Sequence, residues 1–190
     1  MRRWPRLPAH FSSVLIAHNL VVYSAYMEPT QHMVCFSLYA ASRATTKAYA
    51  ALLEPHGLTY PQYLVLVLLW NRDGRSVSDL GQALDLDSGT LSPLLRRMTR
   101  DGLVERGRDS VDERVVTVSL TPRGRELRSE LAHVPACIAQ GMGVTVDGAR
   151  QLIAALTELA DGMRDTATDL RADTRATKTT PEKEMKEEHA

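Results

Sequence analysis

Cys35 is the residue whose chemistry is easiest to name, because a thiolate, unlike a thiol, reacts readily with peroxides. It stands in the stretch C-F-S-L-Y, near the start of an expected helix, where amide dipoles favour a negative charge. Tyr39, one turn further on, and Tyr49, on the same face, could donate hydrogen bonds to a thiolate. Tyr60, at the start of the next expected helix, could supply a third hydroxyl. An inert cysteine in an apolar core fits the residues equally well.

The surroundings expected for Cys35 are apolar. Phe36, Leu38 and the hydrophobic helix that follows would enclose the thiolate in a way that suits an organic hydroperoxide. The other cysteine is Cys137, in V-P-A-C-I-A, where a buried apolar role is the simpler alternative. Two cysteines do not make a disulfide scaffold, so the chain reads as intracellular and is expected to be cytoplasmic.

The elements that would position other functional groups begin at Ser76, where two short helices joined by a tight turn are predicted. Ser76 can cap the first helix, and Asp79 can complete a capping box. The polar residues 85–87 should break that helix. Pro93 has no backbone N–H, so either the second helix begins near Thr90, with Pro93 in its first turn, or one backbone hydrogen bond of the helix is missing. An apolar stripe at helical spacing marks the second helix: Leu91, Leu94, Leu95 and Met98.

A β-hairpin is predicted after the second helix. Gly102 should end that helix in a left-handed conformation, with Leu103 folding back on it. Residues 103–108 form the first expected strand, and the alternation of Val and Leu with Thr and Ser over residues 116–120 predicts a half-buried return strand. The pattern is that of a winged helix-turn-helix, which lays its second helix in the major groove of DNA.

Arginine is concentrated in this part of the chain. From Arg96 to Arg128, nine arginines and six acids leave a net charge of +3, whereas the whole chain is neutral. Arginine's planar fork grips phosphates and guanine edges, so we favour DNA binding over a helical core with a merely charged outer face. The expected DNA-binding residues are Ser88, Gly89, Thr90, Ser92, Arg96, Arg97, Asp112 and Arg114.

Composition sets further bounds. The 190 residues are 44% hydrophobic and 5% aromatic, which fits a single, mainly α-helical domain with a small β-hairpin wing. Zero net charge makes long-range steering toward DNA weak. No apolar run is long enough for a membrane span. The histidines are scattered without ligand spacing and no phosphate-cradling glycine loop occurs, so neither a metal nor a cofactor is expected.

Three segments are predicted. Residues 1–30 are expected to lie outside the fold, with Met27 or Met33 as the true start. Residues 31–170 should form the winged helix-turn-helix domain with its dimerisation helices. Residues 171–190 contain almost no large apolar side chain and should form a disordered tail.

The remaining helices follow from caps and periodicity. The first should run from Thr30 to Tyr49, and the second should be capped by Thr59 and Gln62. Another should start at Thr121, bend near Pro135 and carry Cys137, and a long last helix should follow a cap at residue 145. Apolar faces left over on the first and last helices suggest a dimer interface, although packing within one chain explains them equally.

Four stretches resemble the MarR family of bacterial repressors, and the cysteine motif narrows the resemblance to its organic-hydroperoxide-sensing (OhrR-like) branch. They lie within residues 34–163 and read C-F-S-L-Y-A-A-S-R, L-T-Y-P-Q-Y-L-V-L-V-L-L-W, L-D-S-G-T-L-S-P-L-L-R-R-M and D-E-R-V-V-T-V-S-L-T-P-R-G. The resemblance implies a homodimeric repressor on a pseudo-palindromic operator, with organic hydroperoxide as its inducer.

Residue roles follow from the same resemblance. It implies that Cys35 is the sensor and that the matching tyrosines, Tyr39, Tyr49 and Tyr60, hydrogen-bond to it. Arg114 would enter the minor groove of DNA, oriented by Asp112. Some members of this branch use one cysteine, and others close a disulfide between subunits with a second one. Cys137 stands in about the region of that second cysteine, which favours the two-cysteine mechanism.

Two other functions remain as alternatives. A repressor of the same fold could respond to a small phenolic ligand without redox chemistry. A thiol peroxidase could use Cys35 as its nucleophile, but that reading leaves the helix-turn-helix and the arginine-rich hairpin unexplained. We therefore expect no enzymatic activity.

Overall fold

The computed structural model describes residue 30 and residues 33–108 and 114–179. The chain divides into two units, Met1–Val134 and Pro135–Ala190, which are described separately. The predictions for residues 1–29, for Asp112 in the hairpin tip and for residues 180–190 lie outside the described residues. None of the described helices is long and apolar enough to cross a membrane.

The first unit begins with helices α2 (Val34–Leu53) and α3 (Tyr60–Asn71). The first helix was expected at 30–49, and it starts and ends four residues later. A short 3-10 turn, η2 (Glu54–His56), and Gly57 at φ 66° separate the two helices. The predicted cap of α3 is confirmed, since Gln62 Oε1 accepts from the Thr59 backbone amide at 2.8 Å and from the Thr59 hydroxyl at 3.1 Å.

The helix-turn-helix consists of α4 (Val77–Leu84) and α5 (Ser88–Arg100). Ser76 Oγ accepts from the Asp79 amide at 3.0 Å, which confirms the predicted N-cap of α4. Asp85, at φ 53°, ends this helix in the left-handed region. The turn then leads directly to Asp87, the N-cap of α5.

The start of α5 resolves the alternatives raised by Pro93. Asp87 Oδ1 accepts from the Thr90 amide at 2.8 Å, so the helix begins at Ser88 and not near Thr90. Pro93 therefore lies inside the helix, and the ladder bond to the Gly89 carbonyl is missing. At the other end, Gly102 has φ 68° and the Leu103 amide returns to the Met98 carbonyl at 2.9 Å, as predicted.

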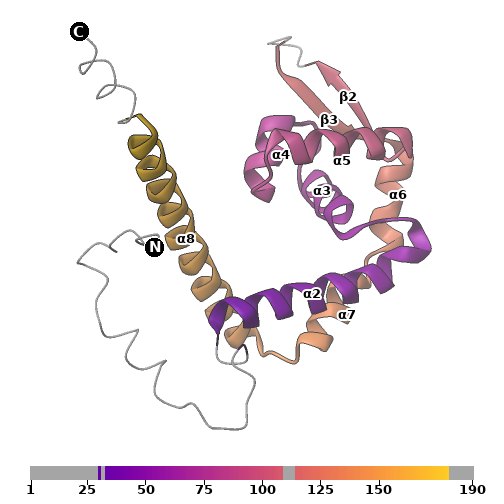
Figure 1. The fold of residues 1–190 in the computed structure, drawn as a ribbon. Coiled ribbons are helices and arrows are strands. Elements are labelled where there is room, and N and C mark those ends of the chain that lie inside the picture. Colours follow the sequence, from indigo (N-terminus) through magenta and orange to yellow (C-terminus); the bar gives the residue numbers. More distant parts are fainter. Residues whose placement is uncertain (1–29, 31–32, 109–113, 180–190) are drawn as a thin grey trace, which may run out of the picture. The chain divides into compact units, whose positions relative to one another are not determined.

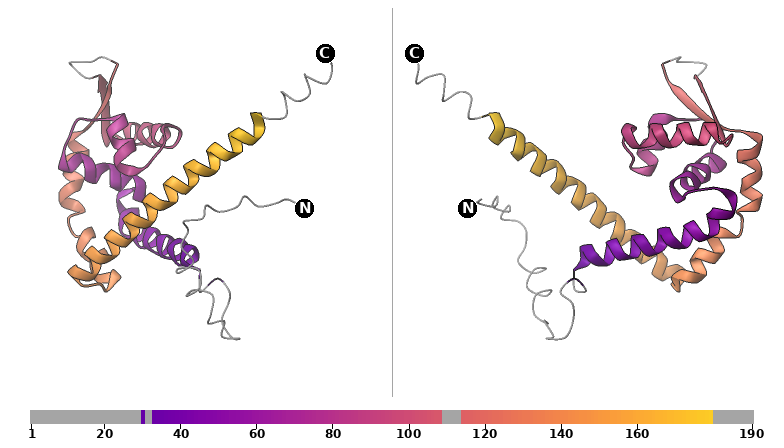
Figure 2. Two further views of the ribbon diagram at one scale, coloured as in Figure 1. Left: turned by 90° about the vertical axis from the view of Figure 1, so that its left-hand side faces the viewer. Right: turned by 45° about the vertical axis from the view of Figure 1, so that its right-hand side comes forward.

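The hairpin is part of a three-stranded antiparallel sheet with the order β1-β3-β2. Strands β2 (Val104–Arg108) and β3 (Val116–Leu120) pair as predicted, with Val104 opposite Leu120. The sequence reasoning missed β1 (Arg75–Ser76), which pairs its two residues with Val118 and Thr117. We call β2, β3 and the segment that joins them the wing; the two strands project beyond α5 (Figures 1 and 2).

Helix α3 is the centre of the first unit. It packs against α4, α5, β3 and α6 (Pro122–Glu130), and Figure 1 shows it between the helix-turn-helix and α6. Its apolar face is fully buried at Val65, Leu66 and Leu69. This packing fixes the helix-turn-helix and the root of the wing on a common support.

The predicted single bent helix after the wing is two helices. Thr121 caps α6 as expected, but a turn at residues 131–133 separates it from α7 (Val134–Met142). Pro135 thus lies in the first turn of a new helix, where its missing N–H costs no hydrogen bond. The prediction placed a bend near Pro135 within one helix, whereas the helix ends at Glu130 and a new one starts at Val134.

The second unit contains the long helix α8 (Val146–Thr179), drawn from orange to yellow in Figure 2. Thr145 caps it by accepting from the Gly148 amide at 3.1 Å. The helix continues into the segment 171–190 that was predicted as a disordered tail, so that prediction is wrong up to Thr179. Residues 171–179 include alanine, arginine and lysine, which are good helix formers, so this stretch can be helical without an apolar face.

Candidate functional site

Cys35 is the second residue of α2 and its side chain is exposed. Met33, the N-cap, provides no side-chain hydrogen bond, and the first amides of a helix have no partner within the helix. The thiol therefore lies at the positive end of α2, as expected. The apolar enclosure predicted for it is absent from the described chain, since the neighbouring Phe36 is 39% exposed.

Cys137 lies in the first half of α7 and is also exposed. Neither cysteine is therefore buried within the single chain, as the alternative of a core cysteine required. The two thiols are free and belong to different units of the chain.

Tyr39 lies one turn after Cys35 on α2 and is 56% exposed. Arg43, one further turn on, donates to the Tyr39 hydroxyl oxygen at 2.9 Å and places its guanidinium 5.5 Å from the ring centroid. The tyrosine hydroxyl thus keeps its own proton available for donation. The sequence reasoning did not single out Arg43, although its i, i+4 spacing from Tyr39 is a usable signal.

Tyr49 and Tyr60 form a stacked pair with ring centroids 4.2 Å apart. Burial raises the pKa of Tyr49, and the neighbouring Tyr60 and Tyr63 raise it further. The Tyr49 hydroxyl therefore stays protonated and can act as a hydrogen-bond donor. The structure thus brings together two of the three predicted tyrosines, from different helices.

This tyrosine pair is remote from the cysteine of its own chain. Cys35 and Tyr49 are fourteen residues apart on one continuous helix, which corresponds to about 21 Å along its axis. A shared helix face does not bring them into contact. Within one chain, Tyr49 and its stacking partner Tyr60 therefore do not lie beside Cys35, and the role of the three tyrosines at the sulfur stays a prediction.

The predicted DNA-binding residues of α5 lie on its outer face. Ser88, Gly89 and Thr90 are exposed in its first turn, whereas Ser92 is half-buried. The opposite stripe is buried, as predicted, at Leu91, Leu94, Leu95 and Met98. Arg96 and Arg97 are exposed on the later turns.

The arginines of this region differ in their surroundings. Arg100 pairs with Asp101 at 3.0 Å on the surface, which neutralises part of the charge at the end of α5. Arg114 is exposed just before β3. Asp112, which was expected to orient it, lies outside the described residues. The predicted DNA-binding side chains that can be placed therefore lie on one helix and beside one hairpin.

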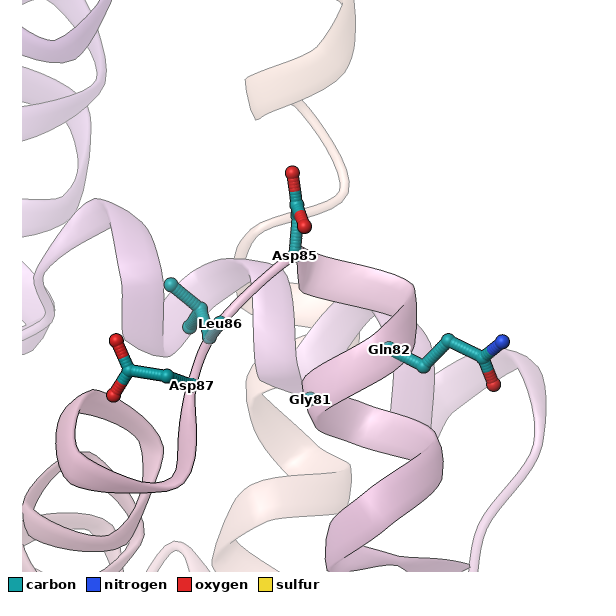
Figure 3. A pocket seen from close by; sticks show the side chains of 5 residues that line it. All are labelled: Gly81, Gln82, Asp85, Leu86 and Asp87. Carbon is teal, nitrogen blue, oxygen red and sulfur yellow. The ribbon is translucent and has the colours of Figure 1, made fainter. Parts of the chain in front are cut away.

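The turn between α4 and α5 contains a shallow hollow lined by Gly81, Gln82, Asp85, Leu86 and Asp87. Figure 3 shows that the two carboxylates leave the turn in different directions. One of them, on Asp87, already caps α5. Gly81 leaves little room there, because a Cβ at this position would lie 3.0 Å from the Leu86 carbonyl oxygen. The hollow is a feature of the turn and does not gather groups around a ligand.

The root of the wing is held by residues that the sequence reasoning missed. Trp70 Nε1 donates to the Gly124 carbonyl at 2.8 Å, which joins α3 to α6. Gly124 itself lies so close to the wing that a Cβ would be 2.1 Å from the Leu103 carbonyl oxygen. A glycine three residues after a predicted N-cap Thr is the only local signal of this contact.

Comparison with known proteins agrees with this architecture. The family model described as "Transcriptional regulator SarA/Rot" matches residues 47–131. The organic hydroperoxide resistance transcriptional regulator of Bacillus subtilis (strain 168) is 42% identical over 131 residues, which cover 69% of this chain and 89% of that protein. The chain belongs to the MarR-type family of winged-helix transcriptional regulators.

Other members of this MarR-type family are similar over the same part of the chain. The regulator TtmR of Methylorubrum extorquens (strain PA1) is 46% identical over 128 residues, 67% of this chain and 66% of that protein. AbfR is a protein of Staphylococcus epidermidis, and its reduced form has been solved bound to DNA. That structure matches this chain with a TM-score of 0.60 and 30% identity, covering 68% of this chain and 91% of the other. Disulfide-formed AbfR has a TM-score of 0.52 at 32% identity, covering 66% and 88%.

Proposed function

We propose that this MarR-type regulator is a cytoplasmic homodimeric repressor that releases its operator when an organic hydroperoxide oxidises Cys35. The observation that carries the proposal is an exposed thiol at the start of α2, with Tyr39 one turn away. Similarity to the Bacillus subtilis regulator of organic hydroperoxide resistance supports this class of inducer.

The sensor site is proposed to form between two subunits. Tyr49 and Tyr60 are suitable donors, but Tyr49 is about 21 Å along α2 from its own Cys35 and Tyr60 stacks on Tyr49. In a homodimer, the pair of one subunit can serve the cysteine of the other. Exposed apolar side chains supply surfaces for this association on α2 and α8: Met33, Val34, Phe36, Leu152, Ile153, Leu156, Leu159 and Met163.

The proposed reaction has two steps. The Cys35 thiolate attacks a peroxide oxygen, the O–O bond breaks, and the alkoxide takes up a proton to leave as an alcohol, so that Cys35 becomes a sulfenic acid. The thiol of Cys137 from the other subunit then attacks the sulfenic sulfur, and water leaves as the disulfide forms. The peroxide gains two electrons, one from each thiol.

The two-cysteine route is favoured by the size of the required effect. A 100-fold loss of DNA affinity needs about 2.8 kcal/mol of coupling. One buried, poorly paired sulfenic acid supplies roughly 1–3 kcal/mol, which is borderline. A covalent link between subunits can hold the two recognition helices away from the roughly 34 Å spacing of successive major grooves. The similarity to disulfide-formed AbfR supports this step.

The proposed DNA contacts follow from the exposed face of α5 and from the wing. The first turn of α5, with Ser88, Gly89, Thr90 and Ser92, faces phosphates or base edges. Arg96 and Arg97 lie further along α5 and hold phosphates. Arg114 enters the minor groove, oriented by Asp112. The similarity to AbfR bound to DNA supports this arrangement.

The test is operator binding to DNA beside the protein's own gene, with and without cumene hydroperoxide, combined with a non-reducing gel. The native protein should release the DNA and form a crosslinked dimer. Cys35→Ser should bind DNA and do neither. Cys137→Ser is the matched control for loss of a thiol, and it should react with peroxide without forming the crosslinked band.

Release from DNA by the Cys35→Ser variant would contradict the proposal. Peroxide-insensitive binding of the reduced native protein would instead favour a repressor that responds to a small phenolic ligand. Full release by Cys137→Ser would indicate the one-cysteine route.

A further inference from the structure

The corner between α3 and β1 contains an acidic residue with several partners. Asp73 Oδ1 accepts from the Gly74 amide at 2.9 Å and from the Leu120 amide, also at 2.9 Å. Its other oxygen pairs with Arg125 of α6 at 3.1 Å. One side chain therefore joins the end of α3, the last residue of β3 and the start of α6.

The bond to Leu120 occupies the position of a missing ladder bond. In the antiparallel register, Arg75 is opposite Val118 and Ser76 is opposite Thr117, so that Asp73 stands opposite Leu120. Gly74 is at φ 67° and turns the backbone away before it can pair. The Asp73 carboxylate supplies the acceptor that a longer β1 would have supplied through its carbonyl.

This bond acts at the point where the wing leaves the body of the protein. β3 is the central strand of the sheet, and β1 pairs with it over two residues only. The Leu120 amide is partly buried, and a buried amide without a partner is costly. The second tie in this region, Trp70 to Gly124, reaches α6 and not the strand itself.

We propose that Asp73 is a positioning residue for the wing, which sets the angle at which β3 and Arg114 approach DNA. The proposal rests on the wing contact assigned to Arg114 above. Asp73 acts through the Leu120 amide, because its ion pair with Arg125 is between side chains that are 37% and 55% exposed and such pairs contribute little.

Substitutions at position 73 separate these interactions. Asp73→Asn keeps an acceptor oxygen for the Leu120 amide and removes the charge, so operator affinity should stay within about twofold of native. Asp73→Ala removes the acceptor and should weaken binding about tenfold, comparable to losing one arginine contact. Arg125→Gln removes only the ion pair and should behave like Asp73→Asn. Thermal unfolding of each variant shows whether it is folded.

Double variants distinguish a positioning role from general destabilisation. Asp73→Ala should add almost nothing to Arg114→Ala, because both remove the same wing contact. It should add fully to Arg97→Ala, whose contact lies on α5. Should Asp73→Ala not fold, Asp73→Ser takes its place, because its side chain is too short to reach Leu120 and it keeps an oxygen near the Gly74 amide.

Native affinity of Asp73→Ala, or full additivity with Arg114→Ala, would overturn the proposal. Arg114→Ala without any effect would instead remove the wing contact proposed for that residue. A hydroxyl-radical footprint then decides for Asp73. If the Asp73→Ala variant no longer protects the DNA outside the major-groove contacts, the positioning role of Asp73 is supported. If its footprint is the same as that of the native protein, that role is overturned.

Discussion

Two regions of the molecule bury their residues very differently. We call α2 together with Tyr60 the proposed sensor region, and α4, α5 and the wing the proposed DNA-reading region. Helix α2 has twenty residues and Leu53 is the buried one, whereas the thirteen residues of α5 bury Leu91, Leu94, Leu95 and Met98. The DNA-reading region is tied to the end of α3 by the Leu120 amide of β3, which donates to Asp73, and Trp70 of α3 donates in turn to Gly124 of α6.

The two regions differ in how much of each is completed within a single chain. The DNA-reading region has its core and its supports within one subunit. The sensor region presents an exposed thiol at one end and a protonated tyrosine pair about 21 Å away at the other. This contrast agrees with the proposal above that the sensor site needs a second copy of the chain, whereas the shape of the helix-turn-helix and the wing does not.

The largest expected effect is at the support of the DNA-reading region. Gly124→Ala would place a Cβ 2.1 Å from the Leu103 carbonyl oxygen, and a backbone oxygen cannot rotate away. We expect the free energy of unfolding in urea to fall by about 4 kcal/mol. Gly162→Ala on α8 is the control, because its Cβ would meet open space in the single chain.

The control variant also probes the second copy. Gly162→Ala should change stability by no more than about 1 kcal/mol, in the stabilising direction. A clear loss would mean that another subunit packs against this face of α8. Near-native stability of Gly124→Ala would contradict the close contact at the root of the wing.

A medium effect is expected from the sensor tyrosines. A hydrogen bond to a charged group contributes about 1.5–3 kcal/mol, so Tyr49→Phe should slow oxidation of Cys35 by about 10- to 100-fold. In a mixed dimer of one Cys35→Ser subunit and one Tyr49→Phe subunit, the remaining thiol faces an intact Tyr49 of the other subunit. Its oxidation, followed as loss of free thiol, should proceed at the native rate.

The matched control combines the same two substitutions in one subunit. In a dimer of a Cys35→Ser, Tyr49→Phe double variant with a native subunit, the remaining thiol faces a neighbour that lacks the Tyr49 hydroxyl, and it should react slowly. The opposite order of rates would place the tyrosine and the thiol in one chain and would remove the contrast between the two regions.

The smallest effect concerns a charged cluster that joins η2 to α6. The hydrogen bond from Arg123 is the main cause that lowers the pKa of Glu130, and His56, with Nδ1 at 3.1 Å from Glu130 Oε2, adds to it. A lowered pKa means stability that is present above the usual carboxyl range and is lost as the pH falls through the folded value. Glu130→Gln should therefore flatten the acid side of the stability curve.

This prediction is measured as urea midpoints at neutral pH and below about pH 4. Glu126→Gln is the matched control, since Glu126 also faces Arg123, at 3.6 Å, but does not contact His56. A larger change in the control than in Glu130→Gln would show that the link between η2 and α6 does not contribute.

Sequence alone predicted the local features of this protein. The caps at Thr59, Ser76 and Thr121, the apolar stripe of α5 and the pairing of β2 with β3 all follow from residues a few positions apart. The same reasoning singled out Cys35 and the outer face of α5. The helix boundaries that were predicted wrongly, such as the start of α2 and the end of α8, lie where no strong cap or glycine marks the end of the helix.

Tertiary structure decided which distant residues meet. Asp73 reaches an amide 47 positions away, Trp70 a carbonyl 54 positions away, and Tyr49 stacks on Tyr60 across a turn. No period or cap encodes such contacts, because they depend on how helices and strands pack once formed. The same is true of exposure, so only the fold showed that the Cys35 thiol lacks its expected apolar enclosure within one chain.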